Sequence, residues 1–188
     1  MINFFILFTI CFASNPINNW ININEDILSN DIKSASMNLE INSIFSNQIN
    51  NSSANIKIFL ASDDKFRINF KNRIVVSDGK SWKVYDVYSN QLFIQGPDKK
   101  LEKILFSLSK IKRIKAFPVK KINDEEYEIS LFDKSQSARL FFNYNNDLEY
   151  ILIINDNLKI KISHIELKKE NSINLLVGDE NTEIFDLR

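Results

Sequence analysis

The chain has 188 residues, and its 24 basic and 24 acidic side chains give a formal net charge of zero. This balance excludes bulk electrostatic attraction to nucleic acid or to anionic membranes. Hydrophobic residues make up 44% of the sequence, which is typical of one folded domain with a substantial core rather than of a disordered protein.

An apolar run, FFILFTICFA, occupies residues 4–13. It is too short to span a bilayer, but it fits the hydrophobic region of a signal peptide. We therefore expect residues 1–13 to be a signal peptide that is cleaved near Ala13, and residues 14–188 to form a single exported domain. A buried N-terminal strand is the alternative. Cys11 would be lost with the signal peptide; lipidation of Cys11 is a competing interpretation, although the residue before it is not small.

The segment Asn15–Asn24 is interpreted as an irregular lead-in, and Asn24 can cap a short helix with Ile27, Leu28 and Ile32 on its apolar side. With only three glycines and three prolines in the chain, the turns must rely mainly on asparagine, aspartate and serine.

Polar and apolar residues then alternate in Met37–Ile41 and in Ile56–Leu60, which predicts two half-buried strands. Between them, the polar segment Gln48–Asn55 predicts a turn. Residues 65–95 predict four more short strands in an antiparallel meander. The Asp78-Gly79 pair between two apolar runs favours a type I′ hairpin turn, which needs a positive φ at both residues.

Residues 99–114 are the clearest helix in the sequence. Leu101, Ile104, Leu105 and Leu108 form one apolar stripe at helical spacing, and Asp98 is a suitable N-cap. The basic residues at its end suit a helix C-terminus better than a nucleic-acid site.

Alternation resumes beyond Pro118 and predicts further strands around Tyr127–Leu131, Ala138–Tyr144, Leu148–Ile154 and Leu158–Ile162. A short strand is expected at Ile173–Val177 and an ordered tail at Glu183–Leu187. The predicted fold class is mainly β (α+β): a single large curved antiparallel sheet that forms an unclosed half-barrel, covered on its concave side by a few short helices.

Catalytic chemistry is not expected. His164 is the only histidine and lies at the end of an alternating segment, where a lone histidine is usually structural. We identify no catalytic residue, no metal ligand set, no phosphate-binding loop and no cofactor motif. Paired acids for glycoside chemistry remain an open alternative.

Ligand binding is the remaining possibility. The pattern alone favours an ordinary core over a lipid pocket, but an incompletely filled curved sheet could enclose acyl chains. The residues that would line this hydrophobic cavity are Met37, Leu39, Ile41, Ile56, Ile58, Phe66, Ile68, Phe70, Trp82, Val84, Leu92, Ile94, Leu101, Leu105 and Leu108.

Residues 74–95 closely resemble the core motif of the LolA family, periplasmic carriers of outer-membrane lipoproteins. The likeness is carried by Val75-Val76-Ser77-Asp78-Gly79-Lys80, by Tyr85-Asp86 and by Gln91. Phe66-Arg67 is similar to the Phe-Arg that follows the second strand of the family. The order of signal peptide, helix, hairpins, mid-chain helix and second strand set extends the resemblance over essentially the whole chain.

The resemblance implies a periplasmic, monomeric protein whose lid helices cover a cavity for acyl chains. It implies acylated lipoproteins as cargo, an inner-membrane lipoprotein-releasing ABC transporter as donor and an outer-membrane acceptor as recipient, with no nucleic acid involved. The chain departs from the family at Ser62-Asp63, where the family usually has Arg-Pro. In the family that arginine contacts the lid helices, and Arg67 is the nearby candidate for a lid interaction here.

Two related interpretations stay open. A LolB-like outer-membrane lipoprotein acceptor shares this architecture but would require Cys11 to be retained and acylated. A cell-envelope lipid-binding or sensor module, as in the RseB family, would join a similar half-barrel to a second domain, for which this chain is short.

Overall fold

The computed structural model describes residues 16–45, 48–61, 63–99, 102, 119–130, 137–155 and 158–188. Within these residues, two helices are α2 (Pro16–Ile23) and α3 (Glu25–Leu28). The strands are β1 (Ile32–Phe45), β2 (Gln48–Ala61), β3 (Phe66–Asn69), β4 (Arg73–Ser77), β5 (Trp82–Asp86), β6 (Gln91–Gln95), β7 (Val119–Lys121), β8 (Glu126–Ser130), β9 (Ser137–Phe142), β10 (Leu148–Asn155), β11 (Leu158–Lys169) and β12 (Glu183–Asp186).

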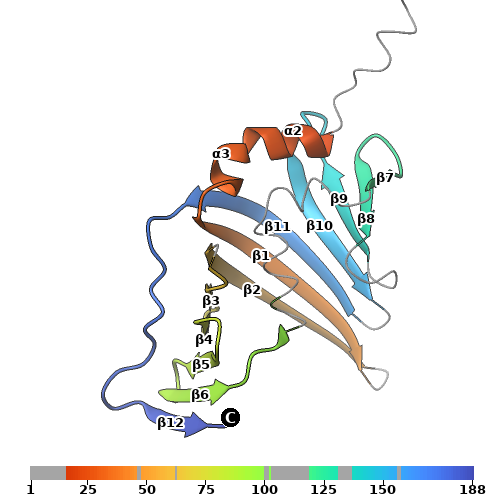
Figure 1. Ribbon diagram of the computed structural model, residues 1–188. Coiled ribbons are helices and arrows are strands. Elements are labelled where there is room, and N and C mark those ends of the chain that lie inside the picture. The colour runs from red at the N-terminus through yellow and green to blue at the C-terminus, as the bar shows by residue number, and fades with distance from the viewer. Residues whose placement is uncertain are drawn as a thin grey trace, which may run out of the picture.

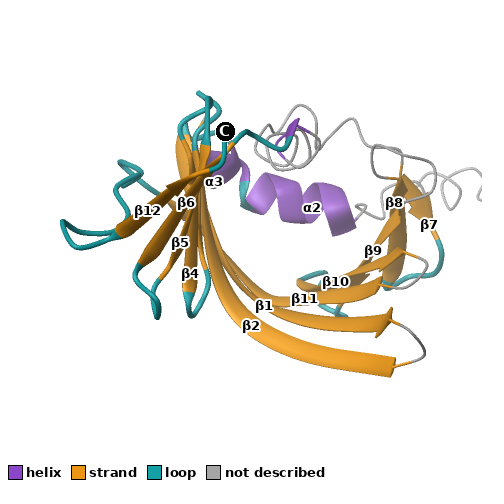
Figure 2. Ribbon diagram, turned by 90° about the horizontal axis from the view of Figure 1, so that it is seen from below, coloured by secondary structure: helices purple, strands orange, loops and turns teal. Residues whose placement is uncertain are grey.

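The twelve strands of the described chain form one sheet in the order β12-β6-β5-β4-β3-β2-β1-β11-β10-β9-β8-β7. Successive strands pair as antiparallel hairpins from β1 to β6 and from β7 to β11, and the long pairing between β1 and β11 joins the two halves. The sheet is strongly curved and does not close on itself (Figure 1). Figure 2 shows α2 lying along the concave side. The predicted unclosed half-barrel with a helix on its concave side is therefore confirmed.

One strand pair departs from the predicted antiparallel order, because β12 runs parallel to β6 at the edge of the sheet. The chain reaches this position from the end of β11 through an extended segment, residues 170–182, which carries no strand. The short strand expected around Ile173–Val177 is therefore absent, and the last strand is β12.

Two segments were predicted wrongly at the start of the chain. The lead-in expected to be irregular is the helix α2, whose Ile17 and Ile21 are buried. The polar segment Gln48–Asn55, expected to be a turn, is the first half of β2 and pairs with β1 over its whole length. Its polar side chains can be accommodated because strand pairing needs only the backbone, and an antiparallel sheet tolerates solvated residues.

The turns depend on asparagine and aspartate side chains, as predicted. The carboxylate of Asp78 accepts hydrogen bonds from the backbone N–H groups of Lys80 and Ser81, both at 2.9 Å. Asp86 and Asn123 bridge the backbone of later turns in the same way. The β4–β5 turn is not the expected type I′ turn, however, because of its two central residues only Gly79 has a positive φ, of 86°.

Candidate functional site

The concave face of the sheet carries a continuous row of apolar side chains, which we call the inner row. The strand register determines which residues belong to the inner row, because paired residues in neighbouring strands point to the same face. Leu39 is opposite Ile162, and Ile162 is opposite Ile151. On the other side, Ile58, Ile68, Val75, Val84 and Phe93 follow one another from β2 to β6.

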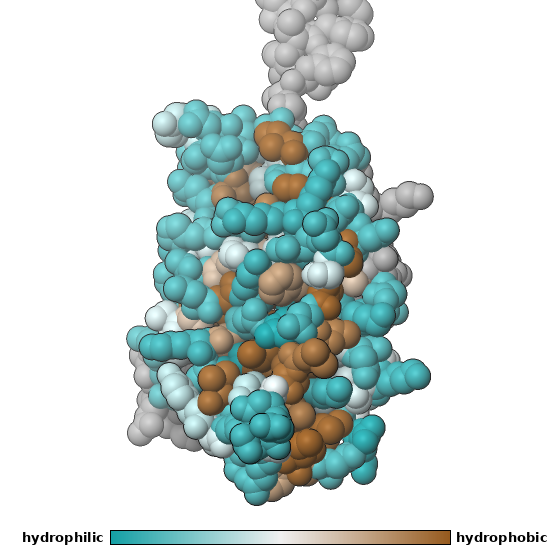
Figure 3. Space-filling view, turned by 90° about the vertical axis from the view of Figure 1, so that its left-hand side faces the viewer, coloured by the Kyte–Doolittle hydropathy of each residue, from teal (hydrophilic) through white to brown (hydrophobic). Residues whose placement is uncertain are grey.

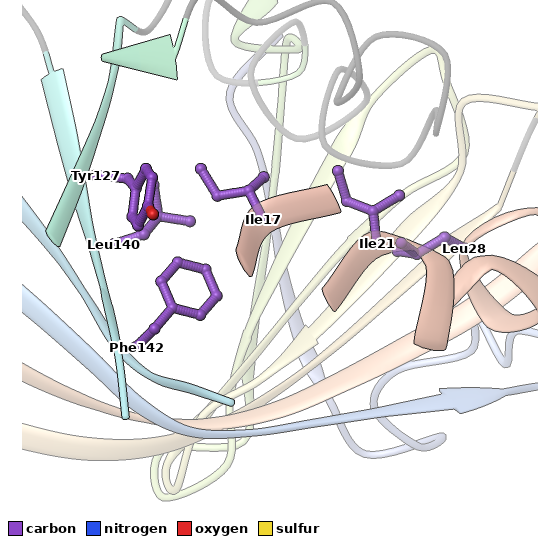
Figure 4. Close-up of a cluster of buried hydrophobic side chains, with 6 residues drawn as sticks. All are labelled: Ile17, Ile21, Leu28, Tyr127, Leu140 and Phe142. Carbon is purple, nitrogen blue, oxygen red and sulfur yellow. The ribbon is translucent and has the colours of Figure 1, made fainter. Parts of the chain in front are cut away.

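One end of the inner row is filled by helix α2. Ile17, Ile21 and Leu28 pack with Tyr127, Leu140 and Phe142 in a buried cluster, and Trp20 lies against it. Figure 4 shows Ile17 pointing toward the side chains that β8 and β9 contribute. The rings of Tyr127 and Phe142 meet edge to face with centroids 5.8 Å apart. This cluster fixes α2 on the concave face.

Away from α2, most of the inner row is half-buried; Ile56, Phe66 and Trp82 are the buried exceptions. Met37, Leu39 and Ile41 on β1, together with Ile151 and Ile153 on β10, all keep part of their surface exposed. Exposed apolar surface that is gathered on one concave face is typical of a binding site for an apolar ligand.

A second buried cluster lies on β3 and β5, where Phe66 packs edge to face against Trp82 with ring centroids 5.2 Å apart. The indole N–H of Trp82 donates to the carboxylate of Glu102 at 2.8 Å, and the hydroxyl of Ser77 donates to the same oxygen at 3.3 Å. The Lys99 ammonium lies 3.0 Å from the other carboxylate oxygen. These contacts attach the chain that follows β6 to the inner row.

The Glu102 carboxylate is ionised although it is only 7% exposed. Burial by itself raises the pKa of this carboxyl, but hydrogen bonds from Trp82, Lys99 and Ser77 together outweigh burial and hold the pKa below its ordinary value. Glu102 was not among the predicted site residues, because it lies outside the apolar stripe of the predicted helix.

The predicted cavity residues fall into four groups, of which the fourth is Leu92 and Ile94. The inner row contains Met37, Leu39, Ile41, Ile56, Ile58, Phe66, Ile68, Trp82 and Val84. Phe70 follows β3 and lines a hollow beside β2. Leu101, Leu105 and Leu108 lie outside the described residues.

Leu92 and Ile94 require a correction, because they lie on the opposite face from Val84. The residue opposite Val84 is Phe93. The length of the β5–β6 turn decides which alternate residues of β6 face the concave side. A shift of one residue in the register moves every side chain of a strand to the other face. Phe93 stacks on Phe185 of β12 with centroids 5.1 Å apart, so the inner row continues to the edge of the sheet.

Several inner-row residues were not among the predicted site residues. They are Val75, Phe93, Tyr127, Ile129, Leu140, Ile151, Ile153, Ile160 and Ile162. Their alternation was visible in the sequence, but the pairing that joins β8–β11 to β1 was not.

Arg67 lies on the face opposite the inner row, in register with Val76. Its guanidinium donates to the backbone carbonyls of Asn174 at 2.9 Å and Leu176 at 3.2 Å. It therefore holds the C-terminal segment against the convex face. The side chains of Leu176 and Ile184 remain largely exposed, and Figure 3 shows apolar side chains gathered in the lower half of the side that it presents.

No group of His, Cys, Asp or Glu within the described residues is arranged to hold a metal ion. Within the same residues, no helix is long and apolar enough to cross a membrane. Within the described residues, the site consists mainly of apolar surface with few polar groups.

No protein-family model matches the chain, and no curated protein matches it. Among solved structures, it is similar to an uncharacterized conserved protein from Thermus thermophilus, with 11% identity and a TM-score of 0.49 over 92% of this chain and 99% of that one. It is also similar to a LolA superfamily protein from Nitrosomonas europaea, with 10% identity and a TM-score of 0.38 over 79% and 94% of the two chains. A putative outer membrane lipoprotein-sorting protein domain from Vibrio parahaemolyticus matches with 9% identity and a TM-score of 0.37 over 85% and 95%.

Proposed function

We propose that this protein is a periplasmic carrier that binds the acyl chains of lipoproteins on its concave face and takes them from the inner to the outer membrane. The observation that carries this proposal is the inner row, an apolar surface that crosses the sheet from β8 to β12 and is mostly half-buried between its two buried clusters. The resemblance of residues 74–95 to the LolA core motif supports the choice of cargo.

Binding of acyl chains requires little more than apolar surface. Each buried methylene contributes roughly 0.8 kcal/mol, so ten methylenes laid on the inner row would contribute roughly 8 kcal/mol before the costs of association. Because such binding is non-directional, the cargo can be transferred to an acceptor that binds its acyl chains with higher affinity. This transfer needs no nucleotide bound to the carrier. An inner-membrane ABC transporter would act as donor and an outer-membrane protein as acceptor.

The test uses two neighbouring isoleucines of β10. Ile153 belongs to the inner row, opposite Ile160 of β11, and is half-buried. Ile154 points to the other face and is 44% exposed. Ile153→Glu should lower the affinity for a fluorescent fatty-acyl probe and for a triacylated lipoprotein at least tenfold, because a charge then faces the ligand. Ile154→Glu should leave both affinities within about twofold of those of the unaltered protein.

The outcomes separate the possible functions. Uptake of the fatty-acyl probe without uptake of the lipoprotein would replace lipoprotein by another envelope lipid as the cargo. Absence of binding to both ligands by the folded, unaltered protein would show that the inner row is an ordinary core and would overturn the proposal.

A further inference from the structure

An open hollow of about 1270 Å³ lies at the point where β2 extends beyond β3. In the described chain, β3 pairs with Lys57–Leu60 of β2, and the preceding residues of β2 have no strand on that side. The far wall of the hollow is formed by the ends of β3 and β4, the turn between them, and Tyr88. We call this hollow the notch.

The notch is continuous with the inner row. Ile56, Val75 and Val84 line it, and all three belong to the inner row by register. Phe70 adds a further apolar wall. A hydrocarbon chain that lies on the concave face can therefore extend into the notch without crossing a polar barrier.

The charged side chains that line the notch are all cationic. They are Lys57, Lys71 and Arg73, and no carboxylate is among the lining residues. Asn55, Asn69 and Asn72 add amide donors around the same space. Because the whole chain is neutral, three cations and no acid at one opening are a local feature that bulk charge does not explain.

Two of these cationic side chains have N–H donors that make no hydrogen bond within the described residues. Lys71 is exposed and makes no hydrogen bond or ion pair within the described residues. Arg73 uses its Nε to contact Asp86 at 3.4 Å, and its terminal nitrogens have no partner within the same residues. Asp86 is itself committed to its turn, where it accepts from the backbone N–H groups of Tyr88 and Ser89. Lys57, by contrast, is already paired with Glu170 at 3.2 Å.

We propose that the notch binds the anionic headgroup of an amphiphile whose acyl chain lies on the inner row. Lys71 and the terminal nitrogens of Arg73 meet the negative charge, and Val75 and Val84 carry the first part of the chain. This inference rests on the proposed function, in which acyl chains lie on the inner row, and extends it to amphiphiles with an anionic headgroup. A headgroup with a net negative charge on a phosphate or carboxylate fits. A zwitterionic headgroup, whose own cation offsets its phosphate, gains less from Lys71 and Arg73, and a neutral headgroup gains nothing.

The test compares two lysophospholipids with the same palmitoyl chain below their critical micelle concentrations. The unaltered protein should bind palmitoyl-lysophosphatidylglycerol roughly tenfold more tightly than palmitoyl-lysophosphatidylcholine at low salt, as two partly exposed cation contacts allow. This preference should shrink as salt is added. Displacement of a fluorescent fatty-acyl probe measures both affinities in one format.

A matched pair of double variants locates the effect. Lys71→Ser with Arg73→Ser should reduce the preference to below about twofold while leaving the affinity for the zwitterionic lipid unchanged. Lys80→Ser with Lys159→Ser removes two positive charges from exposed sites outside the notch and should keep the preference. Circular dichroism and melting temperature confirm that all the variants are folded.

The other outcomes overturn the inference in distinguishable ways. Equal affinity of the unaltered protein for the two lipids would refute the headgroup site but would remain compatible with the proposed acyl-chain binding. Failure to bind either lipid would remove the proposed function as well. If millimolar inorganic phosphate alone displaced the anionic lipid but not the zwitterionic one, the notch would be a site for a free anion rather than for an amphiphile.

Discussion

The indole nitrogen of Trp82 donates a 2.8 Å hydrogen bond to the buried carboxylate of Glu102, 20 residues further along the chain. Trp82 belongs to the inner row and packs on Phe66, whereas Glu102 follows the meander of β3–β6. This bond therefore ties the segment after β6 to the surface on which we expect acyl chains to lie. Its strength should influence both stability and the access of ligand to that surface.

We expect Glu102→Ala to lower the free energy of unfolding by about 1–3 kcal/mol, because it leaves the Trp82 and Ser77 donors without their acceptor in a buried site. Lys99→Ala is the matched control. The Lys99 side chain is 71% exposed, so its loss should cost less than about 1 kcal/mol. Urea unfolding measures both variants, and equal, small effects would show that the carboxylate does not hold the segment.

The same contact should titrate with pH. The pKa of Glu102 lies below its ordinary value of 4.5 in the folded protein, so its contribution to stability is complete above pH 4.5 and is lost as the pH falls through the lower, folded pKa. In a Trp20→Phe background, Trp82 is the remaining tryptophan and its emission reports this step. We expect a transition below pH 4.5 that is absent in Glu102→Gln. A transition that persists in Glu102→Gln would contradict this assignment.

Arg67 should control the C-terminal segment rather than the core. Arg67→Ala removes two hydrogen bonds to the carbonyls of Asn174 and Leu176, which should favour local opening of residues 173–182 by about 1–2 kcal/mol. Hydrogen exchange of that segment should then be faster by roughly five- to thirtyfold. Arg139→Ala removes an arginine that pairs with Glu126 elsewhere on the convex face and should leave this segment protected. Unchanged exchange in Arg67→Ala would show that other contacts hold the segment.

Much of the sheet could be predicted from local alternation, because a half-buried strand shows its period of two in the sequence. Face assignment across turns could not, as Leu92 and Ile94 illustrate: the β5–β6 turn decides which side chains of β6 share a face with Val84. The helix α2 was missed because its asparagines have modest helix propensity. Packing of Ile17 and Ile21 against β8 and β9 decides its structure instead.

The apolar character of the candidate site could be predicted from the sequence, but the full set of strands that contribute to it could not. The inner-row members on β1–β5 were recognised as apolar strand residues, yet the equally important set on β8–β11 enters the site only through the pairing of β1 with β11. The notch depends on β2 being longer than β3. That difference cannot be deduced from the polar segment Gln48–Asn55, which has the composition of a turn.

Replacement of Gly79 in the β4–β5 turn should destabilise the protein, whereas replacement of Gly96 in the loop after β6 should not. Gly79 has a φ of +86°, a conformation that costs an L-residue about 1–2 kcal/mol, whereas an added Cβ there would meet only Asp64 O at an ordinary 3.8 Å. Gly79→Ala should therefore destabilise the fold by about 1 kcal/mol through the backbone alone. Gly96 has no positive φ and no atom within 4 Å of an added Cβ, so Gly96→Ala should be neutral or slightly stabilising. Thermal unfolding of the two variants gives the comparison, and an equal melting temperature for both would mean that the turn relaxes to a conformation that alanine accepts.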